Sequence, residues 1–188
     1  MRIRIVVNSR FRICFVGANV LIDDSSAIFM HNLSRIDSFT RIIGYDYMNV
    51  TMMKRSSIGS FSTVHLGNTL TKNKSSLFIG RDTHISSYSS IGCAGSVFIG
   101  DKCIFGEGLF LHSENHNFDL VDVPIMDQGV NQVGIRIESN CWFGSRVTVL
   151  DGVTVGSGCV VGAGSVITKS FPPRSVIAGV PARLIKSR

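Results

Sequence analysis

The chain has 188 residues, of which 44% are hydrophobic and 17% are charged, and its formal net charge is +6. This composition predicts a single folded domain and argues against a disordered chain. No apolar run approaches the roughly 18 residues of a membrane span, and no basic motif interleaved with aromatic residues is present, so we expect neither a transmembrane segment nor binding to nucleic acid.

Residues 1–15 alternate basic and apolar side chains, which predicts a strand that starts or caps the fold. The apolar run at 1–7 is too short for a secretory leader. From Val16 a degenerate six-residue pattern begins, loses phase and resumes, and the polar run at 71–76 predicts a small outward loop. We expect residues 1–78 to form irregular N-terminal coils or a cap.

The six-residue pattern sharpens from Ile79 and is most regular at 137–169. An aliphatic or aromatic residue recurs there at every sixth position: Ile137, Phe143, Val149, Val155, Val161 and Ile167. A period of six does not fit a helix and is typical of the parallel β-helix. Three hexads would make one triangular turn of about 18 residues, with the apolar positions stacked inside. We therefore expect regular coils over 79–171.

The pattern stops between Leu111 and Ile137, which predicts that residues 112–136 form a loop that leaves the coil. This segment is polar and acidic. Loops held on a rigid scaffold commonly carry functional residues, so we expect the active site here. The repeat ends at Pro172, and residues 172–188 are predicted to form a short tail with a strand, a turn and a basic end.

The five cysteines form no CxxC pair, and an odd number is typical of reduced core thiols in a cytoplasmic protein. Cys141 and Cys159 are eighteen residues apart, so we expect them to stack in adjacent coils as free thiols. No cysteine lies in a recognisable nucleophile motif, and no acyl-enzyme intermediate is expected.

Three motifs resemble the hexapeptide-repeat acyltransferases, and in particular their sugar O-acetyltransferase branch with the galactoside and maltose acetyltransferases. They are W-F-G-S at 142–145, V-G-A-G-S-V-I-T-K at 161–169 and P-P-R-S-V-I-A-G-V-P-A-R at 172–183. The resemblance is strong over 79–186 and weak before it. It implies an all-β, left-handed parallel β-helix, although parallel crossovers in other folds are right-handed. It also implies a homotrimer that binds acetyl-CoA in grooves between subunits.

The family carries one essential histidine in the loop that leaves the coil, and both His112 and His116 are candidates. His116 is favoured because it lies in N-H-N-F, which resembles the N-H-x-F loop of the polysaccharide-type members, and follows Asp101 by fifteen residues. The P-I-x-x-Q-G element at 124–129 is also typical of that loop. Histidine suits a general base for acetyl transfer to a sugar hydroxyl. A carboxylate could orient it, and the choice among Glu114, Asp119 and Asp122 stays open.

The resemblance also suggests the residues around the donor and acceptor. The backbone N–H near Ser145 would bind the oxyanion. Trp142 would either stack on a sugar ring or pack in the groove. The residues expected to bind acetyl-CoA are Ser145, Ala163, Thr168, Lys169, Arg183 and Lys186. The galactoside type reads its sugar with Asn and Asp where Ser86 and Ala94 stand here, so a simple galactoside is not the expected acceptor. The acceptor site is expected to include Glu107, Tyr88, His112 and Trp142.

These observations favour an acetyl-CoA-dependent O-acetyltransferase that acts on a sugar of a surface polysaccharide or its precursor. The basic charge would suit an anionic cofactor or acceptor, or a weak peripheral contact with a membrane surface. An N-acetyltransferase acting on a nucleotide-linked amino sugar is the alternative. A zinc protein of the carbonic-anhydrase type would need three converging histidines, for which His84, His112 and His116 are available. A non-catalytic solenoid is the fourth reading. No metal is expected.

Overall fold

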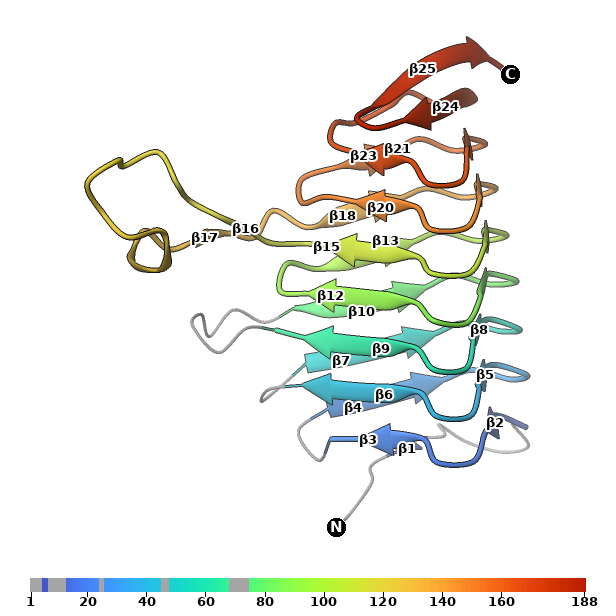
Figure 1. The fold of residues 1–188 in the computed structure, drawn as a ribbon. Coiled ribbons are helices and arrows are strands. Elements are labelled where there is room, and N and C mark those ends of the chain that lie inside the picture. The colour runs from blue at the N-terminus through green and yellow to red at the C-terminus, as the bar shows by residue number, and fades with distance from the viewer. Residues whose placement is uncertain (1–4, 7–12, 24–25, 45–47, 68–74) are drawn as a thin grey trace.

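The computed structural model describes residues 5–6, 13–23, 26–44, 48–67 and 75–188. Its strands stack into a three-sided prism in which every coil passes through sheets A, B and C in turn (Figure 1). The chain winds as a left-handed helix from the N-terminus to the C-terminus, which confirms the predicted fold class. No helix among the described residues is long and apolar enough to cross a membrane.

Each face of the prism is one sheet of mostly two- to five-residue strands. Sheet A contains β1 (Ile5–Val6), β4 (Ser26–Met30), β7 (Met48–Met52), β10 (Ser76–Ile79), β13 (Val97–Ile99), β18 (Ile135–Ile137) and β21 (Thr154–Val155). Sheet B contains β2 (Phe15–Val16), β5 (Arg35–Ile36), β8 (Ser57–Ile58), β11 (His84–Ile85), β14 (Ile104–Phe105), β19 (Trp142–Phe143), β22 (Val160–Val161), β24 (Ser175–Gly179) and β25 (Ala182–Ser187). Sheet C contains β3 (Leu21–Ile22), β6 (Arg41–Gly44), β9 (Thr63–Leu66), β12 (Ser90–Cys93), β15 (Phe110–His112), β20 (Thr148–Val149) and β23 (Val166–Ile167).

Neighbouring strands within each face are parallel, except that β25 runs antiparallel to β24. We name the edges of the prism the AB, BC and CA corners after the sheets that meet there. A hairpin of β16 (Asn115–His116) and β17 (Val130–Asn131), with the short 3-10 helix η1 (Ile125–Asp127), projects from the CA corner (Figure 1).

The core is a column of apolar side chains whose spacing is constant at two corners. Inward residues are six apart across the AB corner, as from Met30 to Ile36, and six apart across the BC corner, as from Ile36 to Ile42. The same two steps recur in the five later coils that start at Met52, Ile79, Ile99, Ile137 and Val155. Each fully buried side chain of this size contributes about 1.5–3 kcal/mol to folding.

From Met30 onward, the variation in coil length arises at the CA corner, whereas the first coil is three residues longer than the second between its paired positions on sheets A and B. Residues stacked on sheet B are 18 apart in Trp142↔Val160, 20 apart in His84↔Ile104 and 27 apart in Ser57↔His84. Since the other two corners keep their spacing, the extra residues lie between sheet C and sheet A. The described N-terminal strands therefore join the same three sheets, although their six-residue pattern is broken. Of the run expected to form an outward loop at 71–76, residues 71–74 lie outside the described residues and Ser76 begins β10.

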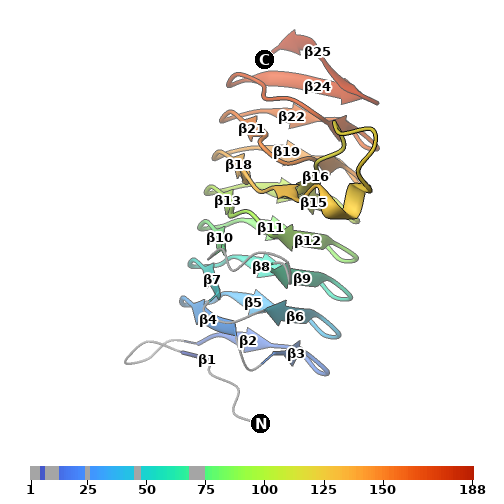
Figure 2. The same cartoon turned by 90° about the vertical axis from the view of Figure 1, so that its left-hand side faces the viewer.

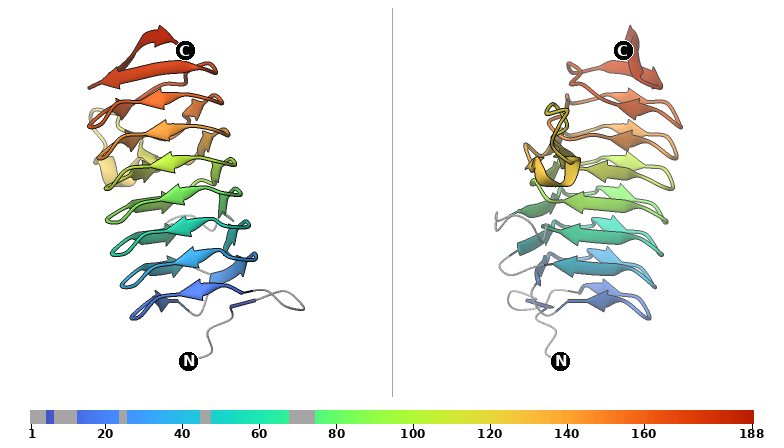
Figure 3. Two further views of the ribbon diagram at one scale, coloured as in Figure 1. Left: turned by 90° about the vertical axis from the view of Figure 1, so that its right-hand side faces the viewer. Right: turned by 60° about the vertical axis from the view of Figure 1, so that its left-hand side comes forward.

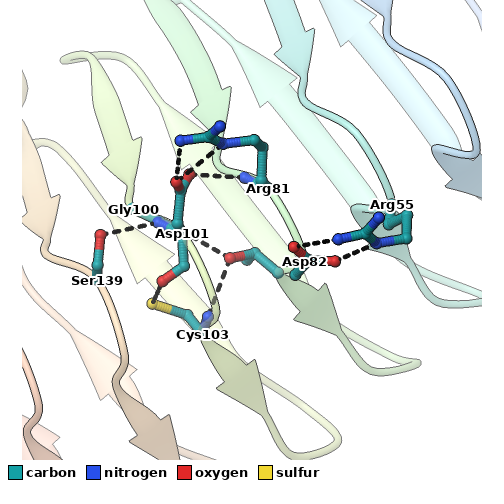
Figure 4. Close-up of polar contacts among 8 residues, drawn as sticks. Arg55, Arg81, Asp82, Gly100, Asp101, Cys103 and Ser139 are labelled. Carbon is teal, nitrogen blue, oxygen red and sulfur yellow. Dashed lines mark hydrogen bonds and ion pairs between the residues drawn. The ribbon is translucent and has the colours of Figure 1, made fainter.

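The AB corner of the central coils carries charged side chains that link successive coils (Figure 4). Arg55 forms a bidentate ion pair with Asp82, in which Arg55 Nη2 lies 2.8 Å from Asp82 Oδ2. The backbone N–H and Nε of Arg81 donate to Asp101 at 2.7 and 3.1 Å. The hydrogen bond from the Arg55 guanidinium lowers the pKa of the Asp82 carboxyl below its usual value.

The BC corner carries a stack of exposed aromatic rings. The ring centroids of Phe39 and Phe61 are 4.9 Å apart, and those of Phe61 and Tyr88 are 5.3 Å apart, with nearly parallel planes. All three residues have a φ near +60°, a left-handed conformation that is uncommon for bulky side chains. Glycine takes this corner position in the next coil at Gly108, where φ is +69°.

The cysteines are free thiols, and four of the five are buried. Cys141 and Cys159 stack in adjacent coils, because the residues that follow them are paired as Trp142↔Val160, and Cys103 precedes them in the same column. This confirms the predicted stacking. Burial raises the pKa of the Cys93 and Cys159 thiols, so these side chains stay protonated at neutral pH.

Candidate functional site

The segment between β15 and β18 leaves the prism at the CA corner and projects into solvent (Figures 1 and 2). Both ends of this segment, which we call the insert, are fixed to the coils. Ser113 Oγ donates to the carbonyl oxygens of Gly92 and Gly95 at 2.8 and 2.7 Å. At the return, the backbone N–H groups of Val133 and Gly134 donate to the carboxylate of Asp151 at 3.0 and 2.7 Å.

Three amide side chains, those of Gln128, Asn117 and Asn131, hold the insert together internally. Gln128 accepts a hydrogen bond from the Leu120 N–H at 2.9 Å and donates to the carbonyl oxygens of Leu120 and Val123 at 2.8 and 2.7 Å. Asn117 donates to the Gln128 carbonyl at 3.0 Å and accepts from Asn131 Nδ2 at 2.8 Å. The glutamine of the P-I-x-x-Q-G element thus fixes the conformation of the loop through hydrogen bonds to its backbone.

His116 lies in the hairpin of the insert, opposite Val130, and its side chain is exposed. It lines a concavity of about 610 Å³ together with Asn115, Asn117, Phe118, Asp119 and Asn131. Of the three carboxylates considered as its orienting partner, Glu114 accepts a hydrogen bond from Gln132 Nε2 at 2.6 Å. Among the described residues, His116 forms no hydrogen bond or ion pair with a carboxylate.

The outer part of the insert exposes large apolar side chains. Phe118 is 70% exposed, Met126 is 77% exposed and Val121 is 95% exposed, and none of the η1 residues is buried. Such a concentration of exposed apolar residues on a projecting segment indicates a surface that contacts another molecule.

The candidate site residues of the C-terminal coils fall into two groups. The first, which we call the sheet-B group, consists of Trp142, Ser145, Ala163, Arg183 and Lys186. Trp142 is exposed on β19 of sheet B, and Ser145 and Ala163 occupy equivalent positions at the BC corner in successive coils. The tail strand β25 adds Arg183, opposite Ala178, and Lys186, opposite Val176, to the same sheet.

Close contact between coils shapes the sheet-B group. A Cβ on Gly144 would lie only 2.6 Å from the backbone nitrogen of Ala163, so glycine is required where these coils meet. The Ser145 carbonyl accepts from the Gly164 N–H at 2.9 Å. Within the described chain, the Ser145 N–H donates to no protein acceptor, and Ser145 is exposed.

The second group lies around the CA corner and consists of His112, His116, Thr168 and Lys169. We call it the CA group. His112 ends β15, and Thr168 and Lys169 directly follow β23 on the same sheet. The ring centroids of His112 and Phe110 lie 6.4 Å apart in a stacked arrangement, and Lys169 Nζ lies 5.9 Å from the centre of the Phe171 ring.

A single chain does not bring the two groups together. The CA corner is the edge of the prism opposite sheet B, and when sheet B faces the reader the insert lies behind the prism (Figure 3, left). The residues expected to contact the acceptor are divided in the same way. His112 belongs to the CA group, whereas Tyr88 and Glu107 lie at the BC corner and Trp142 lies on sheet B.

A pocket of about 290 Å³ lies at the foot of the insert on sheet C, and it includes residues that the sequence alone did not single out. His65 and Gly92 line it together with His112 and Glu114. His65 and Gly92 are paired across neighbouring strands although 27 residues separate them. No six-residue count predicts that pairing, because the coil between them is lengthened at the CA corner.

The three histidines considered for a zinc site occupy different parts of the prism. His84 lies on sheet B, where Ser57 Oγ and His84 Nδ1 are 2.9 Å apart, whereas His112 lies on sheet C. In the part of one chain that the structure describes, no three histidine, cysteine or acidic side chains come together as a metal site.

Known proteins resemble this chain in both repeat and fold. The family model "hexapeptide repeat of succinyl-transferase" matches residues 134–169. Galactoside O-acetyltransferase of Escherichia coli is 35% identical over 113 residues, which are 60% of this chain and 54% of that protein. The chain spans between 42% and 60% of the length of three curated relatives that it matches.

Two solved structures extend the similarity along most of the chain. The polySia specific acetyltransferase NeuO superposes with a TM-score of 0.74 and 26% identity, over 93% of this chain and 75% of that chain. A hexapeptide-repeat acetyltransferase of Vibrio cholerae, solved in complex with acetyl coenzyme A, gives a TM-score of 0.62 and 25% identity, over 78% and 70% of the two chains. In its six-residue repeat and its coil geometry, the chain resembles the hexapeptide-repeat acyltransferases.

Proposed function

We propose that this protein transfers an acetyl group from acetyl-CoA to a hydroxyl group of a carbohydrate, in a site formed by two copies of the chain. The observation that carries the proposal is the division of the candidate residues between the sheet-B group and the CA group, on opposite sides of one prism. The sheet-B group of one copy would bind the acyl donor, and the CA group of the next copy would supply the base.

His116 is the proposed general base. It accepts the proton of the acceptor hydroxyl while that oxygen attacks the thioester carbonyl, which forms a tetrahedral oxyanion. The backbone N–H of Ser145 has no acceptor among the described residues, which makes it a suitable donor to this oxyanion. When the C–S bond breaks, the proton on His116 passes to the departing CoA thiolate. The imidazole thus returns to its neutral form, and no covalent enzyme intermediate is needed.

The donor would lie along sheet B and the BC corner. Trp142, Ser145 and Ala163 flank the acyl end, and Arg183 and Lys186 place two cations on the same sheet for the phosphates. Thr168 and Lys169 lie at the CA corner, so in this proposal they contact the donor from the copy that supplies His116.

The proposed assembly is a homotrimer. The two surfaces that meet are different parts of the chain, so their contact is heterologous and forms a closed ring when the rotation between copies closes. A three-sided prism with one insert per copy suits three such contacts. The exposed apolar side chains of the insert, which include Phe118, Val121 and Met126, would be covered by the neighbouring copy. Light scattering at micromolar concentration measures this directly, and an active monomer would contradict it.

A carbohydrate acceptor is supported by the names of the relatives, one of which acts on galactosides and another on polySia. We infer a sugar of a surface polysaccharide or its precursor. The test is acceptor-dependent release of CoA from acetyl-CoA over a panel of oligosaccharides and nucleotide sugars, corrected for hydrolysis, with mass spectrometry of the product.

The decisive variant is His116→Gln, which removes the base but keeps a polar side chain of similar size. We expect kcat to fall by about 10²- to 10⁴-fold. His84→Gln is the matched control, because His84 is an exposed histidine of sheet B beside Ser57. Full activity of His116→Gln with loss of activity in His112→Gln would move the base to His112.

A further inference from the structure

The pocket at the foot of the insert contains a gap in a column of side chains on sheet C. The column runs Ile43, His65, Gly92, His112 in register from coil to coil, and Leu150 continues it beyond His112. Ile91 and Cys93 on either side of Gly92 point into the core, so position 92 faces outward. Glycine leaves the outer surface open there, with one imidazole in the coil below and one in the coil above.

The gap has the dimensions of one sugar ring. The backbones of His65 and His112 lie one strand on either side of Gly92, so two strand spacings, about 9.5 Å, separate them. One puckered ring fits between them with contacts of about 4 Å on each side. The floor is fixed, since Ser113 Oγ donates to the Gly92 carbonyl at 2.8 Å. The His112 ring is held from the side by its stacking with Phe110.

The lining chemistry suits an uncharged, hydroxyl-rich ligand. Neutral imidazoles both donate and accept hydrogen bonds, the Ser90 hydroxyl does the same, and the Glu114 carboxylate accepts. Glu114 is the charged residue of the lining, and residues 112–135 contain four carboxylates and no lysine or arginine. This local negative charge disfavours an acidic sugar in the gap.

The gap is also close to the proposed base. Glu114 lines this pocket and His116, two residues later, lines a second concavity, and two residues of chain span at most about 6.6 Å. A ring placed over Gly92 can therefore direct one of its substituents towards His116.

We propose that the gap over Gly92, between His65 and His112, binds a neutral hexose unit of the acceptor, with His65 and Gly92 as determinants of specificity. This inference rests on the proposed function and adds the class of acceptor. An acidic sugar unit, such as a uronic or sialic acid, is the competing outcome of the test.

The test measures the acceptor KM of one variant that fills the gap, Gly92→Thr, and of two variants that remove the imidazoles beside it, His65→Ala and His112→Ala. Gly92→Thr adds a side chain that suits a strand, and the nearest atom to a Cβ at this position is the Leu111 carbonyl oxygen at 3.2 Å, so only a small adjustment is needed. We expect this variant to raise the acceptor KM more than 10-fold while the KM for acetyl-CoA changes less than twofold. His65→Ala and His112→Ala should each raise the acceptor KM roughly 3- to 10-fold, the size of one hydrogen bond. Thr63→Ala, on the same strand as His65 but outside the pocket lining, is the control.

Matched neutral and acidic oligosaccharides are compared for every variant, and thermal unfolding verifies that each variant is folded. If the wild-type protein releases no CoA with any acceptor, the proposed function itself fails. If the wild type is active but Gly92→Thr keeps the wild-type acceptor KM, or if acidic acceptors are preferred and respond to these variants, the proposed function stands and this inference is wrong.

Discussion

The CA corner and the other two corners of the prism follow different rules. From Met30 onward, the coils take the same six-residue step at the AB and BC corners, and residues such as Ile36 and Phe143 stack into one continuous core. At the CA corner the number of residues changes from coil to coil, and the insert with His116 leaves the prism there. The two constant corners thus carry the stability of the fold, and the variable corner carries the proposed proton-transfer chemistry.

Removal of the insert should separate these two contributions most strongly. A short Gly-Ser link in place of residues 115–133 removes the proposed base, so we expect activity to fall at least about 100-fold. Apart from Ser113, residues 112–134 contribute no buried side chain, so far-UV circular dichroism should still show a cooperative thermal transition. A variant that fails to fold would show that the variable corner also carries stability.

The opposite experiment removes a core ring from sheet B, between the two corners of constant length. Phe143 is fully buried and its ring centroid lies 4.8 Å from that of Phe105. Phe143→Ala should reduce the free energy of unfolding by about 3–5 kcal/mol, measured by chemical denaturation. Phe61→Ala is the control, because the half-exposed Phe61 ring lies on the outside of the BC corner, and its effect should be much smaller. Equal effects in the two variants would disprove this division.

Mixed oligomers would sharpen the comparison by testing whether the two halves come from different copies. His116→Ala disables the CA group, and Ala163→Trp is designed to block the sheet-B group. Neither variant should be active alone. When the two are co-expressed, about a quarter of the interfaces pair an intact insert with an intact sheet B, and activity should recover to that share.

The double variant with both changes provides the control for this experiment. Co-expressed with wild type, it should also leave about a quarter of the activity if the halves meet between copies, but about half if they meet within one copy. If half of the activity remains in this mixture, and if co-expression of His116→Ala with Ala163→Trp restores none, a site shared between copies is ruled out.

The smallest effect is expected from the charged AB corner. The Arg55 guanidinium lowers the pKa of Asp82, so this carboxylate stabilises the fold above its ordinary titration range, near pH 4, and the contribution is lost as the pH falls through the lowered value. Asp82→Asn should lower Tm slightly at pH 7, since surface ion pairs are weak. The difference between the two proteins should disappear at pH values below the lowered pKa. A difference that persists there would point to packing rather than charge.

The sequence predicts the fold well wherever the coil length is constant. The hexads from Ile137 to Ile167 determine three sheets because each sixth residue is buried, and the stacking of Cys141 with Cys159 follows from the same count. Between Met30 and Ile79 the same steps of six survive at two corners, but insertions at the third shift the phase. Pairs across the longest such coil, like His65 with Gly92, are therefore visible only in the structure.

The candidate site is predictable residue by residue but not in its arrangement. Ala163 and Lys169 are close in sequence, yet they lie at opposite ends of the sheet C strand β23. Trp142 and His116 are expected to act on one substrate, yet Trp142 lies on sheet B and His116 lies in the hairpin that leaves the CA corner. A motif specifies side chains along one chain, whereas a site shared between copies depends on the symmetry of the assembly.

The constant steps at two corners have a consequence for how such a chain acquires new activities. A segment added between Ser113 and Gly134 changes no inward residue, because the coil re-enters sheet A at Ile135 whatever the length of the excursion. The same addition between Phe143 and Val149 would displace the inward positions of that coil. Insertion and deletion at the CA corner can therefore remodel the acceptor side freely, and a designer could graft loops of new specificity there without redesigning the core.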